Sequence, residues 1–321
     1  MPGPDAPPSV TATRLLRRYG TVLAALLIIL VFSVLSPSAF FSVENVINVS
    51  RQISFLVIVA LAATVVMVVG EFDLSVGAVA SLGGVVSAQL AVRGVPVELC
   101  FALAAGAGGL IGLVNGLLVT RFRLLSFITT LAMGTVLGGL TFWLTGGSTV
   151  FENIPERFSA LGRATLLGVP ALSALMLTFV AMSWFLLTHT PFGRRLYAVG
   201  GNETAARLAG IDTDRHKTLA FGIAGLLAAL TGALLASRLG SAQPTGGNGL
   251  FLPAYAAAFL GMTAFKDGVP NVYGTLLGAL IIGLLANGLT ILQVPTFLQD
   301  VITGVIVILA IILQKLGRSD V

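Results

Sequence analysis

Long apolar runs separated by short polar intervals make up most of this chain. A membrane-spanning helix needs about 20 consecutive apolar residues, and the runs reach that length repeatedly. The pattern predicts an all-α, polytopic membrane protein with about ten transmembrane helices, near residues 19–36, 53–70, 74–92, 96–119, 124–145, 168–188, 218–238, 250–265, 272–291 and 296–314. We interpret residues 14–321 as a single transmembrane domain that follows a disordered cytoplasmic tail at 1–13.

Composition agrees with this pattern. The chain has 56% hydrophobic residues, 10% charged residues and a mean hydropathy of +0.99, whereas soluble domains have about 25% charged residues. The net charge of +5 therefore reads as a topology signal and does not indicate affinity for nucleic acid.

The Lys and Arg residues predict the orientation. With both termini in the cytoplasm, all but a few of the 18 Lys and Arg residues fall on the cytoplasmic side, the exceptions being Arg51, Arg93, Arg157, Arg163 and Arg238. The positive-inside rule favours this arrangement. It places a polar loop at 189–217 in the cytoplasm and a second loop at 146–167 outside, where an external partner could bind.

The cytoplasmic loop contains a short predicted helix at 203–209. Asn202 is suited to cap its N-terminus, Glu203 lies in the first turn, where the helix dipole favours an anion, and Gly210 supplies a left-handed stop. Ala205, Ala206 and Ala209 leave little bulk, so another surface could approach closely. Local chemistry equally fits a capped linker helix on the bilayer surface.

Two acids, Glu71 and Asp73, interrupt some of the most apolar sequence, with no basic neighbour. Asp73 either caps a helix that begins at Leu74 or contributes to a solute or gating path, and the two roles are compatible. The segment 240–249 is either a re-entrant or gating segment or a plain turn. The candidates for a translocation path or gate are Asp73, Leu74, Ser75, Asn115, Pro253 and Asn287, although partner helices are the simpler explanation for the two amides.

Two segments of the chain have similar sequence motifs in the same order. A Gly-Val-Pro turn at 94–96 leads through a glycine-rich helix to Asn-Gly-Leu at 115–117, and the same two motifs recur at 268–270 and 287–289. An odd number of predicted spans separates the copies, so the second is inverted relative to the first. We therefore expect an inverted repeat of spans 2–5 and 7–10, with glycines that permit close helix packing.

The sequence contains no G-x-x-x-x-G-K-[ST] loop, no nucleophile elbow and no Cys/His metal spacing. Cys100 is the single cysteine, so an intrachain disulfide is excluded. We predict that this chain is not an enzyme and needs no cofactor. The energy for transport would come from another subunit. The alternative is a gradient, as in a carrier or facilitator for a small polar solute. A membrane scaffold or receptor is a third hypothesis, with little support.

Three motifs resemble those of a known family. Gly-Glu-Phe-Asp-Leu-Ser-Val-Gly at 70–77 is similar to the GG-[IL]-DLSVG signature of the ribose/xylose/galactoside-type permeases of bacterial ABC importers. Residues 192–211 resemble the cytoplasmic coupling segment of that family, and 274–280 resemble its GTLLGA stretch. The resemblance covers essentially the whole chain after the tail. Glu71 departs from it, because the family has glycine there.

The resemblance implies a permease subunit in the bacterial plasma membrane that imports a monosaccharide or similar small polar solute. Its partners would be a second permease subunit, two cytoplasmic ATPase subunits, an external substrate-binding protein and the membrane lipid, but no nucleic acid. The residues expected to couple it to the ATPase are Gly193, Arg194, Asn202, Glu203, Ala205, Ala206, Arg207, Ala209 and Gly210.

Overall fold

The computed structural model describes residues 23, 25–166, 168–264 and 268–318; the predicted tail at 1–13 lies outside them. At the centre of the fold is α3 (Val43–Val68), which starts where the Ser42 side chain accepts the Asn45 N–H. Its most apolar stretch is 89% buried. A helix that is apolar on every side needs protein or lipid around it, and α3 is surrounded by α8, α11, α12 and α13.

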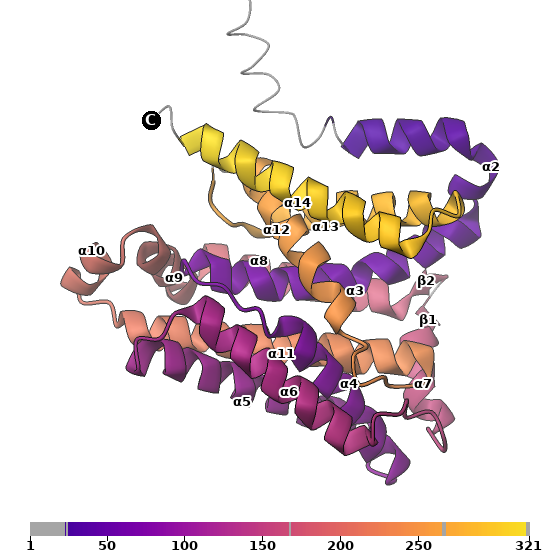
Figure 1. The fold of residues 1–321 in the computed structure, drawn as a ribbon, viewed down its shortest axis with the longest axis horizontal. Coiled ribbons are helices and arrows are strands. Elements are labelled where there is room, and N and C mark those ends of the chain that lie inside the picture. Colours follow the sequence, from indigo (N-terminus) through magenta and orange to yellow (C-terminus); the bar gives the residue numbers. More distant parts are fainter. Residues whose placement is uncertain (1–22, 24, 167, 265–267, 319–321) are drawn as a thin grey trace, which may run out of the picture.

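Long helices lie side by side along the molecule (Figure 1). Together with α3, those that are long and apolar enough to cross a membrane are α5 (Val97–Arg121), α6 (Ser126–Thr145), α8 (Ala171–His189), α11 (Thr213–Leu239) and α13 (Val272–Ile291). The most apolar stretch of α11 is 72% buried, but those of α5 and α6 are 28% and 22% buried. The fold therefore has α3 and α11 in its core and leaves large apolar faces of α5 and α6 exposed.

Shorter apolar helices complete the bundle. They are the stretch Ala25–Leu35, α4 (Val76–Val92), α12 (Phe251–Ala264) with the preceding 3-10 turn η1 (Asn248–Leu250), and α14 (Thr296–Arg318); the brief α2 (Pro37–Phe40) precedes α3. The prediction of an all-α, polytopic membrane protein is confirmed. In Figure 1, α4 and α12 begin near the middle of the molecule, whereas the longer helices run from one end to the other.

The two predicted loops lie at opposite ends of the bundle (Figure 1). One end has α9 (Pro191–Gly201) and α10 (Glu203–Leu208). The other has α7 (Glu156–Arg163) and a small antiparallel sheet of β1 (Thr165–Leu166) and β2 (Val169–Pro170). The segment 146–167 thus contains a helix and a strand, and a bridge between Val150 and Ala242 ties it to the segment after α11.

Glycine permits close contact between these helices. A Cβ at Gly112 would collide with the Phe221 carbonyl oxygen of α11, and one at Gly116 would lie 2.5 Å from Thr218 Cα. On α13, a Cβ at Gly274 or Gly278 would collide with the backbone of α12. The packing role predicted for these glycines is confirmed, as expected where packing drives helix association. Gly106 is different, because its surroundings are open.

Candidate functional site

The polar stretch after α8 folds back onto that helix. The Thr190 hydroxyl caps α9 by accepting the Gly193 N–H at 3.1 Å. A Cβ at Gly193 would collide with the carbonyl oxygens of Leu186 and Leu187, so glycine is required for this sharp reversal. Arg194 points away from the packed side and is exposed.

The short helix α10 forms as predicted from its caps. Asn202 Oδ1 accepts the Ala205 N–H at 2.9 Å, and Gly210 has a φ of 81°, a left-handed conformation that glycine adopts readily. The helix covers Glu203–Leu208, with Ala209 as its C-cap. The N-cap and the stop are therefore confirmed.

The outward face of α10 differs from the predicted one. Leu208 is 86% exposed, whereas Ala206 is 4% exposed and belongs to the core. Ala205 and Ala209 are exposed. The expectation that Ala206 offers a docking surface is wrong, because α10 rests on the protein through that residue. A partner approaching this end meets Leu208 and Ala205.

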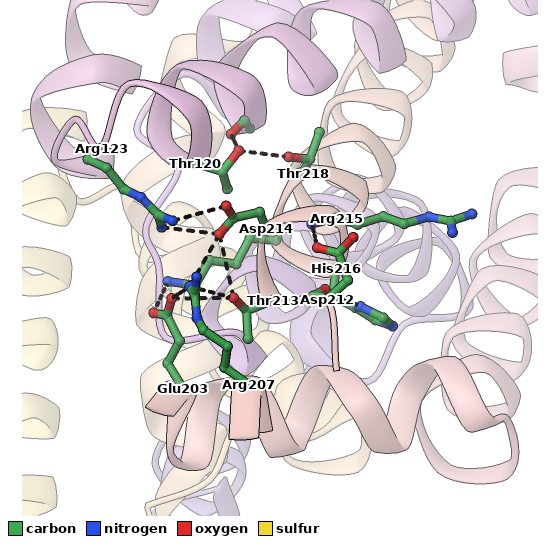
Figure 2. Close-up of polar contacts among 12 residues, drawn as sticks. Thr120, Arg123, Glu203, Arg207, Asp212, Thr213, Asp214, Arg215, His216 and Thr218 are labelled. Carbon is green, nitrogen blue, oxygen red and sulfur yellow. Dashed lines mark hydrogen bonds and ion pairs between the residues drawn. The ribbon is translucent and has the colours of Figure 1, made fainter. Parts of the chain in front are cut away.

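A network of charges joins α10 to α11 and to the turn between α5 and α6 (Figure 2). Arg207 Nη2 lies 2.8 Å from Glu203 Oε1 and donates to Thr213 Oγ1 at 2.8 Å. Asp214 accepts two hydrogen bonds from the Arg123 guanidinium, at 3.0 and 3.1 Å. A bidentate pair of this kind fixes the relative orientation of the two side chains as well as the distance between them.

Lys217 connects α10 to the segment that follows α3. Its Nζ lies 2.7 Å from Glu203 Oε2 and 2.7 Å from Glu71 Oε1. The Lys217 and Glu71 side chains are only 11% and 17% exposed. The hydrogen bond from Lys217 is the main cause that lowers the pKa of Glu203, which therefore stays ionised. Sequence reasoning missed Lys217; the signal for it was Glu71, an acid in apolar surroundings that needs a basic partner.

Beyond Glu71 the chain is non-helical and ends in a turn at 74–75 before α4 begins, and hydroxyl groups of α6 and α12 accept hydrogen bonds from its backbone. Three successive N–H groups each donate to a side chain, in the pairs Phe72 to Ser126 Oγ (3.4 Å), Asp73 to Tyr255 OH (2.7 Å) and Leu74 to Thr130 Oγ1 (2.9 Å). Non-helical backbone away from water needs such partners. The segment 71–75 is therefore fixed between α6 and α12.

Asp73, Ser75 and Asn115, all fully buried, lie together at the start of α4. Asp73 Oδ1 accepts from Ser75 N at 2.9 Å and from Ser75 Oγ at 2.5 Å, and Asn115 Nδ2 donates to Ser75 Oγ at 3.0 Å. The helix begins at Val76 and its N-cap is Ser75, without a side-chain cap. The predicted helix start at Leu74 is therefore two residues too early, and the Asp73 carboxylate accepts the Ser75 N–H in the turn that leads into the helix.

Two of the remaining path candidates, Asn287 and Pro253, lie on other helices, α13 and α12. Asn287 forms a reciprocal amide pair with Asn45 at the start of α3, with bonds of 2.8 and 3.1 Å, so its predicted helix partner exists. Pro253 is the third residue of α12, where its missing N–H costs little. Leu74 is half-buried beside Asp73.

A cavity of about 500 Å³ opens beside the charged network. Its polar lining comes from both ends of the Lys217 bridge and from the turn between α5 and α6, namely Glu71, Thr120, Arg123, Ser126, Glu203 and Lys217. The end of the molecule that contains α10 thus combines an exposed short helix, a charged bridge and a polar opening.

Known proteins are similar to this chain in sequence. Residues 45–311 match the family described as branched-chain amino acid transport system / permease component. The chain is 40% identical to the ribose import permease protein RbsC of Bacillus subtilis (strain 168), covering 94% of this chain and 93% of that protein. It is 35% identical to the D-allose transport system permease protein AlsC of Escherichia coli (strain K12), covering 93% and 92%.

A third relative extends the match. The L-arabinose ABC transporter permease protein AraH of Azospirillum brasilense is 36% identical, covering 99% of this chain and 95% of that protein. No solved structure matches the chain. Matches over this length at this identity establish the family. The chain therefore belongs to the permease components of ABC transport systems, which are the non-catalytic transmembrane subunits of these transporters.

Proposed function

We propose that this permease imports a monosaccharide, together with a substrate-binding protein outside, two ATPase subunits inside and a second permease subunit in the membrane. The names of its relatives support a monosaccharide, since they refer to ribose, D-allose and L-arabinose. The absence of a phosphate-binding loop from the sequence supports an external source of ATP hydrolysis.

The observation that carries this proposal is the Lys217 bridge. An ATPase that docks on Leu208 and Ala205 would push on α10, and Glu203 of α10 shares Lys217 with Glu71. Glu71 leads directly into the segment 71–75, which α6 and α12 hold. A displacement at the surface therefore reaches the start of α4 through contiguous contacts, as a switch between two packed states requires.

The proposed membrane topology has ten spans, made of the long helices and the shorter apolar helices. The excess of Lys and Arg at the α10 end supports both termini and the loop 189–217 in the cytoplasm, with 146–167 outside. An inverted repeat is supported by two reciprocal features. Helix α5 packs on α11 while α13 packs on α3, and Gly94 and Gly268 have φ values of 80° and 71° before the matching helices.

Replacing Leu208 by arginine tests the docking surface. We expect Leu208→Arg to lose the ATPase subunit on co-purification and to lose ATP-driven uptake of radiolabelled sugar, because a charge replaces the most exposed apolar side chain of α10. Leu166→Arg is the control, since Leu166 is 61% exposed at the opposite end. Equal ATPase binding by both variants would refute the docking surface.

A second experiment tests the gradient-driven alternative. Uptake by vesicles that contain this chain without an ATPase would favour it, and neutralising Asp73 should then abolish that uptake.

A further inference from the structure

The two short helices α4 and α12 begin against each other. Ser81 Oγ, in the second turn of α4, accepts the Gly247 N–H at 2.9 Å and lies 3.3 Å from Asn248 Oδ1. A Cβ at Gly77 would lie 3.2 Å from Asn248 Cα, so the absence of a side chain there brings the two segments together. The turn before α12 thus rests on the first turns of α4.

This contact lies deep in the bundle. From Gly77 to the end of α4 is about 22 Å, and from the start to the end of α12 about 20 Å, at 1.5 Å per residue. The far end of α4 meets α6 through Gln89 Nε2 and the Leu144 carbonyl, and the chain just beyond α12 meets α9, where Tyr197 donates to the Pro270 carbonyl. The helices therefore leave the contact toward opposite ends (Figure 1). Since the hydrocarbon core is about 30 Å thick, they meet near its middle.

Polar side chains are exposed at this depth. Asn248 and Thr245 are exposed, and Asn248 Nδ2 makes no hydrogen bond within the described part of the chain. Lipid tails offer amides and hydroxyls no partner, so polar side chains at membrane depth face protein or a water-filled path. The surface around Asn248 therefore does not face lipid.

A second feature at the same helix start indicates a ligand that donates hydrogen bonds. Asp73 Oδ2 and Asn115 Oδ1 are buried acceptors with no partner among the described residues. Buried acceptors without donors are uncommon and costly. The N-terminus of α4, which lacks a side-chain cap, adds N–H donors and a partial positive charge. The first turn of α4 therefore has N–H donors and, through Ser75, unpartnered acceptors, a combination that matches a solute with many hydroxyl groups.

We propose that Asn248, Thr245 and the first turns of α4 form a subsite that holds hydroxyls of the transported sugar halfway across the membrane. The inference rests on the proposed function and adds the place where the solute is held. Asn248 is the contact residue. The Gly77 and Gly247 contact forms the floor beneath it, and Asp73 and Asn115 supply acceptors next to the helix start.

Cysteine accessibility tests the subsite, because the single native cysteine, Cys100, is fully buried and can be replaced by alanine. Asn248→Cys in that background is reconstituted in vesicles with the ATPase and the binding protein, and is treated with a membrane-impermeant thiol reagent. Leu177→Cys is the control, since Leu177 is 56% exposed near the middle of α8 and belongs to an apolar face. We expect labelling at position 248, slowed by whichever of D-ribose, D-allose and L-arabinose the vesicles transport, and no labelling at 177.

A kinetic variant completes the test. Asn248→Ala should raise the KM for uptake about fivefold or more, the value of one to two hydrogen bonds between neutral groups, while ATP hydrolysis stays responsive to the binding protein; Asn248→Gln should recover part of the loss. A cysteine at 248 that stays unlabelled in every nucleotide state, or that crosslinks to a second permease, overturns the subsite and makes this surface a subunit interface. Failure of ATP-driven uptake by the unchanged chain, reconstituted with the ATPase and the binding protein, would instead overturn the proposed function.

Discussion

Removal of the Lys217 ammonium is the most direct test of how α10 communicates with the membrane helices. In Lys217→Met, a side chain of similar length fills the space but cannot pair with Glu71 or Glu203. Both carboxylates, each 2.7 Å from Nζ in the unchanged protein, then lose that partner. We expect α10 to move without displacing the segment 71–75.

The burial of the pair sets the size of the effect. Breaking a fully buried ion pair costs about 3–5 kcal/mol, and a surface pair contributes about 0.2–1 kcal/mol. Lys217 and Glu71 are 11% and 17% exposed, but Glu203 is 36% exposed, so water weakens one of the two contacts. We expect about 2–3 kcal/mol in total. This corresponds to a shift of about 30- to 150-fold in the equilibrium between linked and unlinked α10.

The assay measures sugar uptake and ATP hydrolysis in the same reconstituted vesicles. We expect Lys217→Met to bind the ATPase, since Leu208 and Ala205 are untouched, but to lose stimulation of hydrolysis by the binding protein and most uptake. The hydrogen bond from Lys217 lowers the pKa of Glu203, so the contribution of this carboxylate is lost only as pH falls through that lowered pKa. The difference between the two proteins should therefore be the same at about pH 6 and pH 8.

Arg157→Met is the matched control. Arg157 lies 2.7 Å from Glu98, the same separation as in the Lys217 pairs, but the two side chains are 77% and 70% exposed and lie at the opposite end of the molecule. Water screens such a pair, so we expect nearly unchanged uptake. The reasoning is refuted if Lys217→Met and Arg157→Met give equal uptake and equally stimulated hydrolysis.

Three further changes have defined outcomes. Asn202→Ala removes the N-cap of α10, which should cost about 1 kcal/mol and weaken ATPase binding in a pull-down, whereas Asn202→Ser should retain it. Gly200→Ala places a Cβ against a carbonyl of α3, whereas Gly201→Ala meets open space, so the first should lower the melting temperature in detergent and the second should not. Asn45→Ala and Asn287→Ala each break the same amide pair; their destabilisation, about 1 kcal/mol each, should be less than additive in the double variant.

The sequence predicted the features that local physics determines. A run of about 20 apolar residues is long enough to span a membrane wherever it lies in the chain. The long helices include the predicted spans, although α3 begins at Val43, before the predicted start at residue 53. The caps of α10 were predictable for a similar reason, because Asn202 and Gly210 act on backbone groups within a few residues.

The errors occurred where distant segments decide the outcome. The helix α4 starts at Val76, after a turn in which the Asp73 and Leu74 N–H groups donate to the hydroxyls of Tyr255 and Thr130. The local sequence pattern contains no sign of these partners, which lie on other helices. The face of α10 was misjudged at Ala206 for the same reason. A six-residue helix composed mainly of small and charged residues has too little apolar periodicity to show which side is buried.

Glu71 shows how a departure from a family motif acquires a physical meaning. At a position where the family has glycine, this chain has an acid that is 17% exposed and would be costly to bury unpaired. Its partner, Lys217, also holds Glu203, so one ammonium group compensates two carboxylates that belong to different segments. Glu71 is compensated only while Lys217 of α11 stays beside the segment 71–75. Through its shared partner Lys217, Glu71 therefore makes the position of α10 and the position of the α4 start depend on each other.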